Sequence, residues 1–82
     1  MGQIRTTDFV GKDGGVMTDE VGVITGELTL RTEVDDQGTV VQQVQYKDAD
    51  EWYHVNDAPA AMSEGQDLDG LHALTVEQLR QS

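Results

Sequence analysis

Two stretches of alternating apolar and polar residues constrain this chain more than any other feature of its sequence. The first stretch, residues 21–34, has an apolar parity made of Ile24, Gly26, Leu28, Leu30, Thr32 and Val34. In the second stretch, residues 39–47, the side chains expected inside are Val40, Val44 and Tyr46, and those expected outside are Val41, Gln43, Gln45 and Lys47. A period of two places alternate side chains on opposite faces of a strand. The sequence therefore predicts an antiparallel sheet that is covered on one face.

The flanking segments extend this sheet. Asp-Asp-Gln-Gly at residues 35–38 has the composition of a turn, so it joins the two stretches into a long hairpin. Residues 52–55 are bulky and predict a short strand that closes a meander, and residues 3–10 predict one more strand at an edge. Residues 11–20 contain three glycines and three acids, which predicts a loop that contributes little to the core.

The period changes near the end of the sequence. Within residues 67–81, one side of a helical wheel collects Leu68, Leu71, His72, Thr75, Val76 and Leu79. An apolar stripe of this width is typical of a helix that packs on a sheet. We therefore expect an α+β fold: a three- to four-stranded antiparallel meander sheet with a C-terminal α-helix on one face. The alternative is a small SH3-like β-barrel with the helix as an appendage.

The length of 82 residues allows one small domain, predicted to span residues 1–82. The absence of cysteine excludes disulfides and thiolate zinc sites, and an intracellular, cytoplasmic protein is the simplest interpretation. Apolar runs of two or three residues are too short for a membrane span, so we expect no membrane partner. The composition, poor in lysine and rich in valine, threonine, aspartate and glycine, is common in high-GC bacteria.

Charge narrows the choice of partner. Sixteen acidic residues against five basic ones give a net charge of −11. Nucleic acids are bound by lysine and arginine, and a domain this acidic repels polyanions, so nucleic acid is excluded as a partner. Two interpretations of the acidity remain open. It serves solubility, including adaptation to a salty or high-GC bacterial cytosol, or it serves the recognition of a basic protein.

The residues that could support catalysis or metal binding form no recognisable pattern. His54 and His72 belong to no HxH or HExxH motif, and the acids near glycine lack the spacing of a calcium loop. We expect structural or surface roles for both histidines. His72 lies at the margin of the packed face of the predicted helix, where it can touch Trp52 or Tyr53. No serine or threonine lies in a nucleophile elbow. The sequence therefore predicts no catalytic residue, no metal, no cofactor and no enzyme.

One short segment remains as a candidate site. Three acids are followed directly by two large aromatic residues: Asp48, Asp50, Glu51, Trp52 and Tyr53. Neighbouring residues of a strand point to opposite faces, so one of the two aromatic side chains can lie outside the core. An aromatic residue surrounded by acids is typical of a hot spot for a basic protein surface. In the alternative interpretation, Trp52 anchors the core, Tyr53 lies under the loop that leads to the helix, and the acids only form the turn.

The sequence supports two functional hypotheses. In the first, the protein is a non-catalytic protein–protein interaction module that engages a basic partner, as an immunity protein, antitoxin or inhibitor does. In the second, it is a structural or assembly protein that forms a homo-oligomer through its sheet edges. The outward Val41 and the edge strand near Ile4 motivate the second hypothesis. The oligomeric state expected is a monomer or a homodimer.

Overall fold

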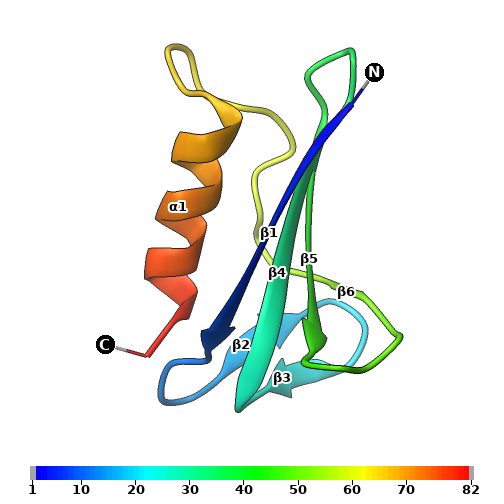
Figure 1. Ribbon diagram of the computed structural model, residues 1–82, viewed down its shortest axis with the longest axis vertical. Helices are drawn as coiled ribbons and strands as arrows, with labels where there is room; N and C mark the ends of the chain where they lie inside the picture. The colour runs from blue at the N-terminus through cyan, green and yellow to red at the C-terminus, as the bar shows by residue number, and fades with distance from the viewer. Residues whose placement is uncertain (1, 82) are drawn as a thin grey trace.

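A computed structural model describes residues 2–81; Met1 and Ser82, which bound the predicted domain, lie outside the described residues. The elements in chain order are β1 (Gln3–Val10), β2 (Val16–Thr18), β3 (Gly22–Ile24), β4 (Glu27–Val34), β5 (Val40–Tyr46), β6 (Tyr53–His54) and α1 (Leu68–Leu79). The larger sheet is antiparallel with the order β1-β4-β5-β6, and β2 and β3 form a separate two-stranded sheet. Helix α1 lies against one face of the larger sheet (Figure 1). The α+β prediction is confirmed, and the barrel alternative is wrong because both sheets of the described chain are open.

The hairpin of β4 and β5 forms the centre of the larger sheet, as the alternation predicts. The Asp35 carboxylate accepts hydrogen bonds from the backbone N–H groups of Gln37 and Thr39, at 2.8 and 2.9 Å, and so closes the turn. All the apolar residues predicted inside β4 are buried. The prediction for Tyr46 is wrong, because its side chain is 42% exposed. Tyr46 is the last residue of β5, whereas α1 contacts β1 and β4.

The chain before β4 differs from its prediction. Residues 21–34 do not form one strand: Gly26 adopts φ of 91°, and the chain changes direction there, so that β3 pairs with β2 instead. The prediction of a loop with little core at residues 11–20 is also wrong, since Val16 and Thr18 of β2 are buried. Gly15 permits this hairpin, because a Cβ at that position would lie 2.3 Å from a methyl group of Val23.

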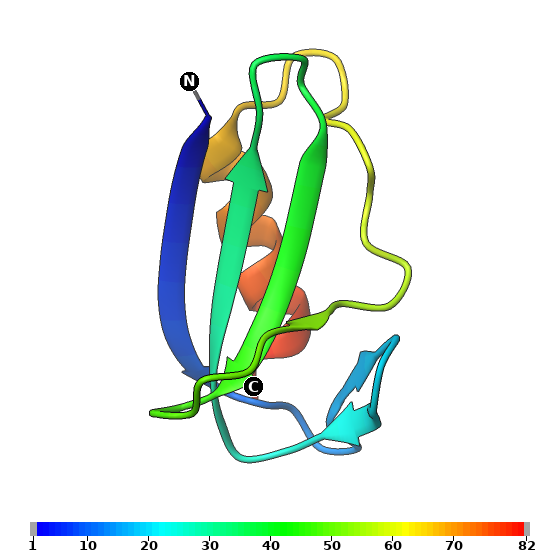
Figure 2. The ribbon, with the colours of Figure 1, turned by 90° about the vertical axis from the view of Figure 1, so that its right-hand side faces the viewer.

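The buried residues form two apolar clusters with polar side chains between them. The main cluster contains Phe9, Val16, Ile24, Leu28, Leu30, Val44 and Val55. The smaller cluster contains Val34, Val40, Leu68 and Leu71. Between them along the strands and the helix lie the buried Thr32, Gln42, His72 and Thr75, which we call the polar layer. Figure 2 shows α1 behind the sheet along much of its length, and the β2–β3 hairpin at the lower end.

Helix α1 is fixed at both ends. Asp67 caps its start, with the carboxylate accepting a hydrogen bond from the N–H of Gly70 at 2.7 Å. Asp69, in the first turn, pairs with the Arg5 guanidinium of β1 at 2.6 Å. After the helix, the N–H of Gln81 donates to the carbonyl of Val10 at 2.7 Å. The end of the described chain is thereby bonded to the edge strand β1.

Candidate functional site

The predicted binding residues lie in the connection between β5 and β6. The N–H of Ala49 donates to the carbonyl of Tyr46 at 3.0 Å, and Asp48 adopts φ of 66°, so the chain turns tightly here. The side chains of Asp48, Asp50 and Glu51 are exposed. This connection projects from the end of the sheet (Figure 2). We call residues 48–53 the acidic turn.

The two aromatic residues of the acidic turn point to opposite faces of the sheet. Tyr53 pairs with the inward-facing Val44 and packs against the main cluster. Trp52 lies on the outer face, where its ring centroid is 4.4 Å from Cζ of Arg31. The interpretation in which Trp52 anchors the core is therefore wrong, because the pairing with Val44 turns Tyr53 inward and its neighbour outward.

Trp52 and Arg31 form a small unit on the outer face of the sheet. The Arg31 guanidinium donates from Nη2 to Oε1 of Gln43 on β5. Its Nε is buried and has no hydrogen-bond partner within residues 2–81. The indole is half-buried over this cation, an arrangement in which the ring face attracts positive charge. Trp52 therefore packs on Arg31 at the outer face, in the same turn as the three exposed acids.

Tyr53 is linked to the acids by its hydroxyl group. The Tyr53 O–H donates to Oε2 of Glu51 at 3.2 Å. Burial raises the pKa of the Tyr53 hydroxyl, and the Glu51 carboxylate raises it further. The phenol therefore stays neutral near pH 7 and remains a hydrogen-bond donor. Of the predicted set, Glu51 and Tyr53 contact each other directly.

A further acid reaches the strand next to the acidic turn from a distant part of the sequence. Glu20, in the β2–β3 turn, accepts from the backbone N–H of His54 at 2.8 Å and pairs with Nδ1 of the same residue at 2.7 Å. The hydrogen bond from the His54 side chain is the main cause that lowers the pKa of the Glu20 carboxyl. Both side chains are well exposed, at 51% for His54 and 39% for Glu20. The β2–β3 hairpin thus brings another carboxylate close to the predicted site.

Sequence reasoning missed two members of this surface, for different reasons. Glu20 is 34 residues from His54, and no local pattern predicts that they meet. The position of Arg31 is predictable in part, because Arg31 has the outward parity of β4 and so shares a face with the aromatic residue that points outward. The sequence does not determine which of the two aromatic residues, Trp52 or Tyr53, points outward.

His72 lies far from the acidic turn, in the polar layer. Its Nε2 is 2.8 Å from the Thr7 hydroxyl and its Nδ1 is 2.8 Å from the Thr32 hydroxyl. The expectation that it touches Trp52 or Tyr53 is wrong, because α1 packs over β1 and β4 whereas the aromatic residues adjoin β6 at the other edge. Burial lowers the pKa of His72, as does the nearby Arg5. Among residues 2–81, no three His, Asp or Glu side chains converge as metal ligands would.

Comparisons with protein families, curated proteins and solved structures found no match to this chain. In the part of the chain that the structure describes, no helix combines the length and the apolar character needed to cross a bilayer.

Proposed function

We propose that this protein is a non-catalytic interaction module that binds a basic protein surface through the acidic turn. The observation that carries the proposal is the composition and exposure of the acidic turn: a half-buried indole packed on Arg31 and three exposed acids in the same turn, on a domain of net charge −11. The five residues of the proposed site are Asp48, Asp50, Glu51, Trp52 and Tyr53.

Each part of the site has a role in this proposal. The carboxylates attract lysine and arginine of the partner and speed its approach, because complementary charge raises association rates. The aromatic residues supply apolar contact area at little cost in conformational entropy, as hot-spot residues do. The partners that fit this site are basic proteins of the kind that immunity proteins, antitoxins and other protein inhibitors bind. We place the interaction in the cytoplasm, because the chain has no cysteine for an oxidising compartment to pair.

Affinity capture from a native lysate tests the proposal. Wild-type protein is compared with D48N/D50N/E51Q and with the matched control D13N/D57N/E64Q, which removes three exposed acids elsewhere and gives the same net charge. We expect a basic protein to be captured at low salt by the wild type and the control, and to be lost with the acidic-turn variant. Equal capture by the two variants, or an empty result at every salt concentration, would contradict the proposal.

A titration with the captured protein then locates the contact. Trp52 is the only tryptophan of the sequence, so its fluorescence reports on the acidic turn directly when the partner contains no tryptophan or is observed by difference. We expect the emission to change on binding and the W52A variant to bind more weakly. An unchanged emission at saturation would place the contact elsewhere.

A second candidate function is assembly into a homo-oligomer through sheet edges. It is favoured by β1, which lies at the edge of the larger sheet and exposes Ile4. The charge of −11 on each copy opposes this assembly at low salt. Sedimentation at micromolar concentration decides the question, and a monomer at all salt concentrations would exclude it.

A further inference from the structure

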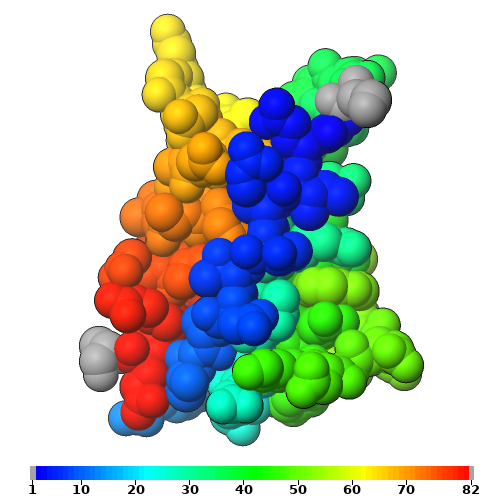
Figure 3. Space-filling view, in the orientation of Figure 1, coloured from blue at the N-terminus to red at the C-terminus, as the bar shows by residue number. Residues whose placement is uncertain are grey.

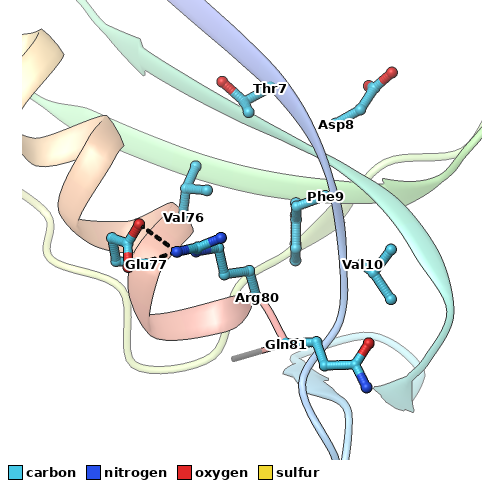
Figure 4. A pocket seen from close by; sticks show the side chains of 8 residues that line it. All are labelled: Thr7, Asp8, Phe9, Val10, Val76, Glu77, Arg80 and Gln81. Carbon is cyan, nitrogen blue, oxygen red and sulfur yellow. Dashed lines mark hydrogen bonds and ion pairs between the residues drawn. The ribbon is translucent and has the colours of Figure 1, made fainter.

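A groove of about 500 Å³ lies between the edge strand β1 and the last turns of α1. Figure 4 shows Phe9 and Val10 on the strand side and Val76, Glu77 and Arg80 on the helix side. Phe9 is almost fully buried and Val76 is half-buried, so both offer apolar surface at its base. In the space-filling view, the residues of β1 run beside the helix along the whole groove (Figure 3).

The backbone of β1 has hydrogen-bonding groups that point toward this side. The carbonyl of Val10 accepts from Gln81 rather than from β4, whereas the N–H of Gly11 donates to Gly26 on the opposite side. In an antiparallel strand, the N–H and C=O of one residue point to the same side, and the side alternates along the chain. The backbone groups of Ile4, Thr6 and Asp8 therefore point away from β4, to the edge. Within residues 2–81, no strand pairs with this edge from Ile4 to Asp8.

The chain itself pairs with one end of this edge. Arg80 forms an antiparallel bridge with Gly11, and two backbone hydrogen bonds flank it: Lys12 N–H to Leu79 O at 2.9 Å, and Gln81 N–H to Val10 O at 2.7 Å. This pairing covers the end of β1 only. The part of the edge from Ile4 to Asp8 continues in the same line beside the groove.

We infer that this edge binds an extended peptide segment of another protein as an additional antiparallel strand, with an apolar side chain in the groove and a basic side chain beside Asp8. Main-chain hydrogen bonds supply the affinity in this mode of recognition, and alternate side chains supply the specificity. The site lies at the β1 edge of the sheet, opposite the β6 edge that carries the acidic turn. The inference therefore does not depend on the proposed function.

The register of β1 determines the sequence of the bound segment. A peptide residue opposite Asp8 lies on the outer face of the sheet, where the Asp8 carboxylate accepts from the Thr29 hydroxyl at 2.7 Å, so a lysine or arginine fits there. The next residue, opposite Thr7, points to the helix face and reaches the apolar base formed by Phe9 and Val76. Figure 4 shows Thr7 and Asp8 on opposite sides of the strand. The expected segment thus contains a basic residue followed by an apolar one.

A second copy of this chain fits the edge less well. The carbonyl of Ile4 already accepts a hydrogen bond from Nη1 of Arg5 at 3.0 Å. Pairing of two β1 strands through the edge-facing groups of Ile4, Thr6 and Asp8 would also place Ile4 of each copy opposite Asp8 of the other, an apolar side chain against a carboxylate. It would also join two domains that each carry a charge of −11. A basic peptide meets neither obstacle, because its charge complements that of the domain.

Backbone-directed variants test the inference with a defined probe. The probe is the fluorescent, N-acetylated and C-amidated peptide Ser-Lys-Leu-Lys-Thr-Val-Ser, followed by anisotropy and by amide shifts of the ¹⁵N-labelled protein. T6P removes an edge-facing N–H without breaking a bond to β4, which is the position in which a strand tolerates proline. We expect T6P to weaken binding at least about tenfold, and T6V, which keeps the N–H, to bind within about twofold of the wild type.

A charge exchange provides the second arm and does not depend on how well T6P folds. D8K should weaken the lysine probe about threefold and strengthen a probe with glutamate in place of lysine by a similar factor. The matched control E64K makes the same change of net charge at an exposed position outside the groove, and should change the affinity for either probe by less than about twofold because salt screens distant charges.

Several outcomes would overturn the inference. They are wild-type affinity in folded T6P, identical behaviour of D8K and E64K, amide shifts confined to the acidic turn, or no binding of the lysine probe at low salt. A wild-type dimer that T6P converts to a monomer would assign the edge to a second copy of the chain instead. Loss of partner capture by the acidic-turn variant with intact probe binding would leave this inference standing.

Discussion

The two apolar clusters of this domain differ in how completely they are closed. The main cluster has a fully enclosed centre, Val16, Leu28, Leu30 and Val44, with no exposed surface, although Phe9 and Val55 at its margin keep 9 and 8%. The smaller cluster has no such centre, since every member keeps between 3 and 8% of its surface exposed. The main cluster lies at the end where the β2–β3 hairpin adds a further cover to the sheet. The smaller cluster is covered by α1 and by the irregular segment that contains Met62. The comparison teaches that the short second sheet, and not the helix alone, completes the core.

The polar layer between the clusters fixes the position of the helix. Gln42 donates through Nε2 to the hydroxyls of Thr32 and Thr75, at 3.1 and 2.9 Å, and His72 bonds to Thr32 as well. If α1 moved along the sheet by one turn, these groups would face apolar side chains, and each unpaired buried polar group costs free energy. The layer therefore selects one register for the helix, which two purely apolar clusters would specify less strictly.

Truncation in the main cluster should have the largest effect. We expect Leu30→Ala to lower the free energy of unfolding by about 3–4 kcal/mol, because Leu30 is fully buried and the site is closed on all sides. Urea denaturation measures this change. The control Leu74→Ala removes the same atoms from a side chain that is 50% exposed, and should cost no more than about 0.5 kcal/mol.

The corresponding change in the smaller cluster should cost less. Leu71→Ala should lower the free energy of unfolding by about 2–3 kcal/mol, since the partly open surroundings of Leu71 relax or hydrate more readily. The same urea experiment compares the two variants. A larger effect for Leu71→Ala than for Leu30→Ala would show that the helix end, and not the hairpin end, dominates stability.

The polar layer should be sensitive to the loss of one hydroxyl. Thr32→Val keeps the shape but leaves Gln42 and His72 without a shared partner, so we expect a loss of about 1–2 kcal/mol. Thr29→Val is the matched control on the outer face, where the lost bond to Asp8 is exposed to water. If both variants were equally stable, the buried hydrogen bonds of Thr32 would contribute no more to the free energy of unfolding than the exposed one of Thr29.

Acidification should weaken the polar layer by a smaller amount. The pKa of His72 in the folded state lies below its ordinary value of 6.5, chiefly because of burial and then Arg5, with Asp69 acting in the opposite direction. The unfolded chain therefore binds a proton at this position more readily, and the contribution of His72 to stability is fully present above pH 6.5 and is lost as the pH falls through the lower pKa of the folded state. Urea midpoints at about pH 7.5 and pH 5.5 should differ in the wild type and differ less in His72→Gln.

The sequence predicts long periodic elements better than short ones. The alternating stretches 21–34 and 39–47 and the helical stripe within residues 67–81 contain β4, β5 and α1. Strand β2 has three residues, too few for a period to appear, and its glycine-rich surroundings indicate a loop. Strand β3 falls within the alternating stretch 21–34, whose pattern predicts a single strand continuous with β4. What makes them strands is burial against the main cluster, a tertiary effect that local patterns do not contain.

The candidate site is predictable to a similar degree. The acidic turn follows from composition alone, and the structure places Asp48, Asp50 and Glu51 at the surface as a turn requires. The faces on which Trp52 and Tyr53 lie depend on the pairing of Tyr53 with Val44. Gln42 is a polar residue that is nevertheless buried, because it shares the inward parity of Val40 and Val44 on β5. In both cases the register between strands decides, and a single sequence gives register only where a pattern is long.

The bonds between β1 and α1 have a consequence for how the chain reaches its native state. Arg5 and Asp69 are 64 residues apart, and Thr7 and His72 are 65 apart, so β1 is anchored by residues that are synthesised long after it. Contacts of such long range slow folding, because the loop between them must close before they stabilise anything. On the ribosome, the β4–β5 hairpin can pair early, but the first strand must wait for the helix to emerge before its inner face is covered.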